Sequence, residues 1–426
     1  MPSRRQFYPG PAVLCLVMRN SLDFLTNPPP GLAAAIQAAR ELGLEAHLVG
    51  GAVRDLLLGR EPIDFDIMLE RDADQAARRC AELLGGSVVV VNRRFSTARV
   101  VRGRLAPVDL LDRQGGLDQD LGLRDFTANA MAWRLAPQLD RRPVDPFDGE
   151  RDARQGLVRA VGPHSVIDQP IRALRAFRLM ALFGPQAQIE PQTVEQLQSA
   201  APGLPQEPGE TAGRELFGAL TIPGLAKRLE LMRDSGVLSA ILPELYDAAP
   251  RAVLRARALE RLTCAGLPDE YAGYLDRTAP LVALALFGAQ ENTDGRQMLR
   301  RLRRPRAQIK SLEALRSGAA RIGDADRLTL RTLAFELGID ALGAALVASC
   351  DAHNPLDLLS AMLRELPIGL DLARHPLLSG HDLVQLGAQP GPGLGELLQR
   401  LDTERLADPS IERNRALELA RDWITA

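Results

Sequence analysis

The chain has 426 residues, which is too long for one ordinary domain and suggests several compact units. Its composition, 46% hydrophobic and 25% charged, is typical of a globular protein, and an aromatic content of only 4% favours cores made of packed helices. A formal net charge of −2 excludes nucleic-acid binding through overall charge, although a local basic surface would still attract a phosphate backbone.

The amino-terminal residues and the cysteines bear on localisation. Residues 1–29 carry two arginines before a short apolar run, and we expect a disordered extension there, or a start codon placed upstream of a true start at Met18. No run approaches the roughly 20 apolar residues of a membrane span, so no membrane partner is expected. The four cysteines are scattered without a CxxC pair, which predicts reduced thiols in a cytoplasmic protein: Cys15, Cys80, Cys264 and Cys350.

Short strand-like runs alternate with helical patterns from residue 30 to residue 148. Helices are predicted over 31–42 and 72–84, and the strand-like runs read AHLVGG, DFDIML, SVVVVN, TARVVRG and PVDLLD. Beyond this region, helical periodicity dominates to the end of the chain. The sequence therefore predicts an α+β fold, with a mixed β-sheet and helices first and an all-α remainder after it.

A glycine pair lies where the first strand-like run meets a helical pattern. Gly50 and Gly51 at such a turn allow backbone N–H groups to approach a phosphate, and Arg54 in the following first turn would reach the same anion. Many glycine pairs of this kind are only tight turns, so the turn needs further support before it is taken as a phosphate site.

Two aspartates follow in the next strand-like run. Asp64 and Asp66 are two residues apart, so in a strand they project from one face about 6.5 Å apart. Two carboxylates on a buried face are costly unless a cation compensates them, which predicts a pair of Mg²⁺ ions. Asp109, on another predicted strand, is the candidate third acid. The alternative is an exposed edge strand with outward-pointing acids.

Three later segments combine charged and apolar residues in patterns that suggest binding. In LRDFTANAMAW the polar residues stand at a predicted helix start, and the alternative is that they only favour the helix terminus. In DQPIRALRAFR three arginines recur at spacings of three, and the alternative is a solvated basic stripe. Residues 296–310 are densely basic, which favours contact with an RNA backbone over a solvated helix face: Arg300, Arg301, Arg303, Arg304 and Arg306 are the candidates.

Six ordered motifs together resemble the class II tRNA nucleotidyltransferases and bacterial poly(A) polymerases. They are GGAVRDLLLGR with DFDI, FSTARV, LRDFTANAMAW, VDPFDGERDARQGLVRAVG, IRALRAFRLMALFG and PLLSGHDLVQLGAQPGPGLGELL. Ser96 stands where the family usually has Gly, and Leu123 replaces the first Arg of the third motif. The resemblance implies a catalytic head over 30–148, a base-recognising neck over 149–220, a helical body over 221–330 and a tRNA-binding tail over 331–426.

The resemblance also implies roles for individual residues. Asp64, Asp66 and Asp109 would be catalytic, with Asp64 and Asp66 as ligands of two Mg²⁺ ions. The expected nucleotide-binding residues are Gly50, Gly51 and Arg54 at the triphosphate, Arg124, Asp125 and Asn129 at the sugar and phosphates, and Asp168, Gln169, Arg172, Arg175 and Arg178 at the base.

Two features bear on which nucleotide is added. Gln169 stands where the family has an aspartate, and an amide both donates and accepts, so it would select cytosine over uracil less sharply. The segment between PVDLL and DLGLRDF is short, running only from Asp112 to Gln119, as in members that add only CC. We therefore expect addition of cytidylates from CTP to the 3′ end of tRNA, with the acceptor arm of the tRNA bound by the helical part of the chain and with no DNA partner. The alternatives are CCA or A addition with ATP, poly(A) synthesis, and a non-catalytic RNA-binding relative.

Overall fold

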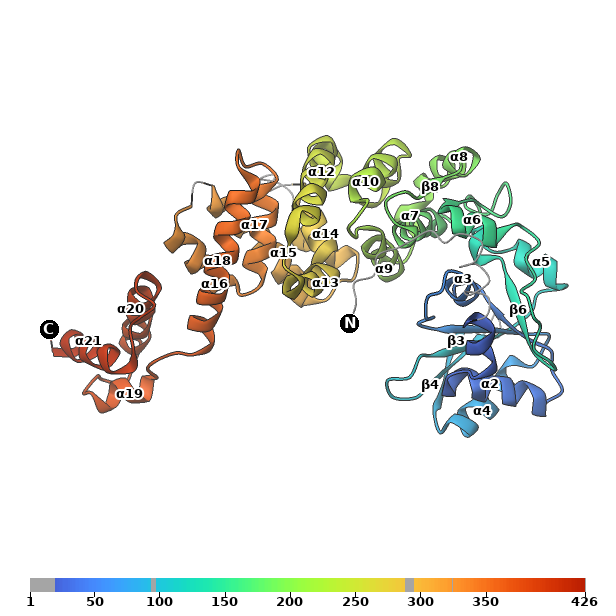
Figure 1. Cartoon of the computed structure of the whole chain (residues 1–426), viewed down its shortest axis with the longest axis horizontal. Helices are drawn as coiled ribbons and strands as arrows, with labels where there is room; N and C mark the ends of the chain where they lie inside the picture. The colour runs from blue at the N-terminus through green and yellow to red at the C-terminus, as the bar shows by residue number, and fades with distance from the viewer. Residues whose placement is uncertain (1–19, 93–96, 288–294, 324, 426) are drawn as a thin grey trace. The chain divides into compact units, whose positions relative to one another are not determined.

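The computed structural model describes residues 20–92, 97–287, 295–323 and 325–425 (Figure 1). These residues form two compact units. The first unit runs to Glu207 and includes Ser235–Val237, and the second comprises Pro208–Asp234 and the chain from Leu238 onward. The predictions for residues 1–19, including Cys15, and for Ser96 concern positions outside the described residues.

The first unit is built on a six-stranded mixed sheet in the order β3-β4-β5-β2-β1-β6. Neighbouring strands are antiparallel except for the pair β2 and β5, which is parallel. The strands are β1 (Ala46–Val49), β2 (Phe65–Leu69), β3 (Ser87–Asn92), β4 (Thr97–Val101), β5 (Val108–Asp112) and β6 (Ala132–Ala136). The predicted strand-like runs thus correspond in order to β1, β2, β3, β4 and β5, and the α+β fold is confirmed.

Helices α2 (Pro30–Glu41) and α4 (Ala73–Leu84) pack on each other and on the sheet. Small residues on their inner faces, such as Ala38 and Ala77, are fully buried in the core of this unit. Residues 20–26 are also helical; Leu25 is buried in the same core, and the Ser21 hydroxyl donates a 2.9 Å hydrogen bond to the carbonyl of Leu56. The described end of the expected extension, 20–29, therefore belongs to the head.

The rest of the first unit is mainly helical, with some of its helices between strands of the sheet in the chain and the others after the last strand. A short parallel pair, β7 (Leu157–Val158) with β8 (Gln188–Ile189), was not predicted from the sequence. The other elements are α3 (Gly51–Leu57), α5 (Leu117–Gly122), η1 (Thr127–Asn129), α6 (Gly149–Gln155), α7 (Ile171–Phe183), α8 (Pro191–Ala200) and η2 (Ala201–Gln206).

In the second unit, every element assigned within the described ranges is a helix. Helix α10 packs on α12, α15 on α17, and α16 on α18. The helices are α9 (Gly209–Ala219), α10 (Leu225–Asp234), α11 (Val237–Ile241), η3 (Pro243–Ala248), α12 (Ala249–Gly266), α13 (Asp269–Ala285), α14 (Gly295–Arg301), α15 (Arg306–Ile322), α16 (Arg327–Leu337), α17 (Asp340–Ser349), α18 (Pro355–Arg374), α19 (Gly380–Gln385), α20 (Gly393–Ala407) and α21 (Arg413–Thr425).

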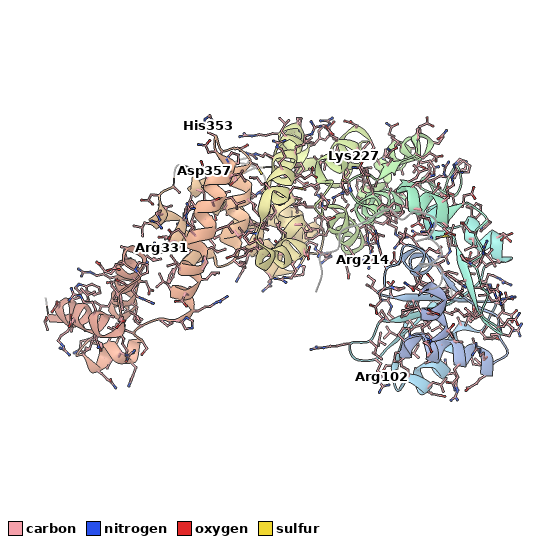
Figure 2. The ribbon with its side chains drawn as sticks, in the orientation of Figure 1. Arg102, Arg214, Lys227, Arg331, His353 and Asp357 are labelled. Atoms are coloured by element: carbon pink, nitrogen blue, oxygen red, sulfur yellow. The ribbon has the colours of Figure 1, made fainter. Side chains whose placement is uncertain are left out.

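The boundary predicted between 330 and 331 falls inside α16 rather than between domains. Arg331 of α16, labelled in Figure 2, donates to Glu365 of α18 at 2.9 Å and to the Leu406 carbonyl at the end of α20 at 2.6 Å. Helices α19 to α21 form a separate apolar cluster around Leu401 and Ala416. None of the helices in the described ranges is both long and apolar enough to cross a membrane.

Candidate active site

The predicted glycine turn joins β1 to α3. Gly50 has φ of 73°, a conformation that costs a non-glycine residue strain. A Cβ at this position would lie 3.1 Å from Nη1 of Arg124 and 3.5 Å from Oδ2 of Asp66. Gly50 therefore leaves space directly between a guanidinium and a carboxylate, where a side chain would intrude.

Asp66, Asp109 and Arg99 form one row across three neighbouring strands. Asp66 of β2 is paired with Asp109 of β5, and Asp109 is paired in turn with Arg99 of β4. Directly paired residues project from the same face of a sheet, with strands about 4.8 Å apart. Arg99 holds Asp109 by two hydrogen bonds, Nε to Oδ1 at 2.7 Å and Nη2 to Oδ2 at 2.6 Å. The two acids predicted on separate strands are thus neighbours.

The carboxylates of this row repel one another. Asp64 is exposed and immediately precedes β2, while Asp66 is partly buried. The pKa of Asp66 is raised from 3.8 to about 6, first by burial and then by Asp64 and Asp109, while Arg124 and Arg99 partly offset the shift. Negative charge is therefore concentrated and incompletely neutralised at this point of the sheet.

Asp64 and Asp66 fit a divalent cation, because carboxylate oxygens are the donors that Mg²⁺ prefers and an added cation would relieve their repulsion. In the described part of the chain, no three His, Cys, Asp or Glu side chains lie together as a ready-made metal cluster. The ion pair between Asp109 and Arg99 agrees with this, since both oxygens of Asp109 are already occupied. Asp64 and Asp66 are thus the residues that would hold a metal.

Two hydrogen bonds and an ion pair connect four other predicted residues. Nη1 of Arg54 donates to Oδ1 of Asn129 at 2.6 Å, and Nδ2 of Asn129 donates to Oδ1 of Asp125 at 3.1 Å. Oδ2 of Asp125 pairs with Nη1 of Arg175 on α7 at 3.6 Å. The structure therefore brings α3, the Arg124–Asn129 segment and the neck helix α7 together.

Arg172 lies at the centre of this region, but its guanidinium faces backbone. It donates to the carbonyls of Leu123 and Ser165, both at 2.8 Å, and to that of Arg124 at 3.4 Å, and only 9% of the residue is exposed. Burial lowers the pKa of Arg172. These contacts indicate that Arg172 fixes the backbone that carries Arg124 rather than presenting a free edge to a base.

The remaining predicted neck residues lie at the surface. Asp168 and Gln169 are exposed in the turn before α7, and Arg178 is exposed one helical turn beyond Arg175. The charge of Asp168 acts on Arg172, which places this acid near the same cluster. Asp168 and Gln169 are accordingly the neck side chains best available to a ligand.

The motif VDPFDG has a structural role that the sequence pattern did not reveal. Asp145 accepts the backbone N–H groups of Gly149 at 2.7 Å and Glu150 at 3.0 Å, which caps α6. A Cβ on Gly149 would lie 2.1 Å from the carbonyl oxygen of Thr127, and the Thr127 hydroxyl donates to Asp152 at 2.8 Å. Helix α6 thereby holds η1, the element that carries Asn129.

The basic segment of the second unit divides into two groups. Arg301 donates to the carbonyl of Ile241 at 3.0 Å and pairs with Glu244 at 2.9 Å, while Arg304 lies over the ring of Phe217 at 4.1 Å. These two arginines support the packing of the unit. Arg300, Arg303 and Arg306 are exposed, and they remain the candidates for contact with a phosphate backbone.

Two sets of basic residues were missed by the sequence analysis. Arg99 was missed because a single arginine in a strand carries no sign of its cross-strand partner. A surface cavity beside α12 is lined by four arginines of that helix together with Cys350 and Asp351. The available signal was a spacing of four residues, which places side chains on one helix face and occurs twice in this set: Arg251 with Arg255, and Arg257 with Arg261.

Comparison with known proteins gives consistent results. Residues 46–110, which run from the start of β1 into β5, match the family model for the poly(A) polymerase head domain. The chain is 28% identical over 395 residues to a CC-adding tRNA nucleotidyltransferase of Synechocystis sp., covering 89% of this chain and 93% of the relative. It is 29% identical over 410 residues to an A-adding tRNA nucleotidyltransferase of Deinococcus radiodurans, covering 84% and 91%.

The fold as a whole is also similar to a solved structure. The Thermotoga maritima CCA-adding enzyme complexed with tRNA superposes with a TM-score of 0.70 over 96% of this chain and 98% of that chain, at 22% sequence identity. At that identity the likeness concerns the fold alone.

Proposed function

The chain belongs to the family of class II tRNA nucleotidyltransferases and bacterial poly(A) polymerases, and from this premise we propose that it adds cytidylates (CC) from CTP to the 3′ end of tRNA and releases pyrophosphate. The observation that carries the reaction type is the pairing of Asp66 with Asp109 on neighbouring strands beside the open turn at Gly50, with the charge of Asp64 acting on Asp66.

In the proposed mechanism, Asp64 and Asp66 hold the divalent ions. When bound, two Mg²⁺ ions lower the pKa of the attacking hydroxyl and neutralise the charge of the departing pyrophosphate. Asp66 must be ionised to act as a ligand, and a pKa of about 6 leaves it mostly ionised at neutral pH. The positive charge of a bound ion would favour that ionised form further.

The triphosphate would lie at the turn between β1 and α3. Gly50 leaves this space open, and Arg124 borders it with Nη1 3.1 Å from the position that a Cβ of residue 50 would take. Arg54 is held in place by Asn129, so its charge is fixed beside the same turn. Both guanidinium groups suit phosphate oxygens.

The sugar and base would be bound by the segments that pack against this turn. Asp125 and Asn129 are fixed through Arg54 and Arg175, which orients them for hydroxyl recognition. Asp168 and Gln169 are exposed and would contact the base edge. A carboxylate accepts from the exocyclic amine of cytosine, and an amide can both accept from that amine and donate to the ring.

The connection between β5 and α5 supports restriction to cytidylate. Only residues 113–116 separate these elements, and they are tied down at two points. Arg113 donates to the carbonyl of Gly115 at 3.0 Å, and the backbone N–H of Gln114 donates to Asp120 at 2.9 Å. A short, internally bonded connection has little freedom to rearrange the pocket for the larger base of ATP.

The relatives differ in the nucleotide that their names say they add, so a second candidate function is tested beside the first. An A-adding relative is about as similar as a CC-adding one, so addition of A, or of complete CCA, is the second candidate. The test is incubation of the purified protein with Mg²⁺ and each of three tRNA transcripts. The first transcript lacks the 3′ CCA, the second ends after the first C of CCA, and the third ends after the second C. Each nucleoside triphosphate is supplied alone. We expect C residues to be added to the first two transcripts and none to the third.

Other outcomes identify the alternatives. A single A on the transcript ending in CC indicates A or CCA addition, and a long A tract indicates poly(A) synthesis. If no nucleotide is incorporated on any transcript, the chain is an RNA-binding relative without activity and the proposed function is wrong.

A further inference from the structure

The row formed by Asp66, Asp109 and Arg99 contains a positively charged side chain next to the carboxylates. Arg99 occupies both oxygens of Asp109 in a bidentate ion pair, which is the strongest geometry available to a guanidinium and a carboxylate. The side chain of Asp109 is only 16% exposed, whereas that of Arg99 is 42% exposed. The arginine therefore approaches the acid from the solvent side.

Arg99 also acts on the other two acids. Its pKa is raised by the hydrogen bonds to Asp109 and further by the charges of Asp109, Asp64 and Asp66, against the opposing effect of burial. One guanidinium thus serves as counter-charge to three carboxylates. A divalent ion placed among these acids would compete with Arg99 for the two oxygens of Asp109 and would experience repulsion from the guanidinium.

We propose that Arg99 is a positioning residue that competes with divalent cations for the carboxylate of Asp109. With the ion pair intact, the site offers an incoming cation two carboxylates, Asp64 and Asp66. With the ion pair broken, it offers three. Arg99 thereby weakens metal binding in the nucleotide-free protein. This inference rests on the proposed function in one respect, since it requires Asp64 and Asp66 to bind the cation.

The test is Mn²⁺ binding to the nucleotide-free, full-length protein, with free Mn²⁺ measured by electron paramagnetic resonance. We expect Arg99→Gln to bind Mn²⁺ about tenfold more tightly than the parent protein, which corresponds to about 1.4 kcal/mol. Arg99→Lys, which keeps the charge but loses the bidentate geometry, should fall between the two. Arg104→Gln is the matched control, because Arg104 is exposed in the turn after β4 and its loss also removes one positive charge.

A double variant tests whether the freed carboxylate of Asp109 is needed for the gain, whereas Arg99→Lys, which keeps the charge, separates release of Asp109 from simple loss of charge. If the freed carboxylate causes the gain, Arg99→Gln combined with Asp109→Asn should return to the affinity of the parent. The inference is overturned if Arg99→Gln binds Mn²⁺ no more tightly than the parent, or if the double variant keeps the full gain. Circular dichroism melting verifies folding, and Arg99→Lys carries the test if Arg99→Gln unfolds.

The same assay distinguishes failure of this inference from failure of the proposed function. Asp64→Asn combined with Asp66→Asn should abolish Mn²⁺ binding in both the parent and the Arg99→Gln background. If binding persists there, the metal site proposed for catalysis is wrong, and the competition inferred for Arg99 falls with it. If the double aspartate variant abolishes Mn²⁺ binding and Arg99→Gln alone leaves the Mn²⁺ affinity unchanged, only the role of Arg99 is refuted.

Discussion

Arg54 of α3 donates a 2.6 Å hydrogen bond to the side-chain carbonyl of Asn129, a residue 75 positions later in the chain. This bond joins the glycine turn to the segment expected to bind the sugar. Asn129 in turn donates to Asp125, and Asp125 forms an ion pair with Arg175. The phosphate, sugar and base regions of the proposed site are therefore connected by hydrogen bonds and an ion pair, so a change at one residue should affect the others.

Replacing Gly50 by alanine tests the turn. Gly50→Ala combines the strain of a φ of 73° with a Cβ 3.1 Å from Arg124, whereas Gly43→Ala has a φ of 66° but meets nothing within 4 Å. We expect both variants to lose about 1 kcal/mol of unfolding free energy. Only Gly50→Ala should also reduce kcat/KM for CTP, by about 100-fold. Equal kcat/KM values for the two variants would show that the turn does not border the nucleotide.

The raised pKa of Asp66 gives the metal-free protein a particular dependence on pH. Because the folded-state pKa is about 6 and the ordinary value is 3.8, the folded state binds the proton more tightly than the unfolded state. This contribution to stability is present below about pH 4 and is lost as the pH rises through 6. Relative to Asp66→Asn, the parent protein with a chelator should lose up to about 3 kcal/mol of unfolding free energy across that interval.

Urea unfolding of both proteins at several pH values measures this difference. A difference between parent and variant that stays constant from about pH 4 to about pH 7 would contradict the shift. Added Mg²⁺ should restore stability to the parent above about pH 6 and leave Asp66→Asn almost unchanged, because an ion that binds only the folded state stabilises it.

Gln169 is the position at which base choice can be altered. Gln169→Asp replaces an amide that donates and accepts by a carboxylate that only accepts, and it should therefore favour cytosine over uracil more strongly. A well-placed contact of this kind is worth about 1–3 kcal/mol, so the ratio of kcat/KM for CTP to that for UTP should rise by about 5- to 150-fold. Gln198→Asp, an exposed substitution on α8, should leave the ratio unchanged. No change with Gln169→Asp would remove Gln169 from the base site.

Replacement of Arg172 should lower the stability of the protein rather than change its nucleotide specificity. Arg172→Gln removes hydrogen bonds to the carbonyls of Leu123 and Ser165 from a buried site, and we expect a loss of about 2–4 kcal/mol of unfolding free energy. Arg178→Gln, on an exposed position of the same helix, should cost less than about 1 kcal/mol. Chemical denaturation measures both. A stable Arg172→Gln protein with altered nucleotide preference would instead support direct base recognition.

The contrast between Arg172 and Asp66 shows what the sequence can and cannot predict. Asp66 and Gly50 follow from local patterns, since alternation in a strand and glycine at a strand-to-helix turn depend only on neighbouring residues. The partner of Arg99 depends on the register between β4 and β5, and the inward direction of Arg172 depends on packing between segments far apart in the chain. The continuation of α16 through residue 331 was missed for the same reason, because its partners lie on α18 and α20.

The exposed arginines Arg300, Arg303 and Arg306 should contact the tRNA backbone, whereas Arg301 and Arg304 should act on folding. Each phosphate contact releases counterions, so loss of one contact lowers the slope of log affinity against log salt by about 1. The triple variant with glutamine at 300, 303 and 306 should therefore bind tRNA more weakly, with a slope reduced by about 2–3, and keep its melting temperature. The double variant with glutamine at 301 and 304 should melt at a lower temperature, because it loses the pair with Glu244 and the contact with Phe217.

Filter binding at several salt concentrations, with melting curves of the same proteins, measures both effects. If the triple variant keeps the salt slope of the parent, the tRNA backbone is bound elsewhere on the protein, and the four arginines of α12 become the next residues to replace.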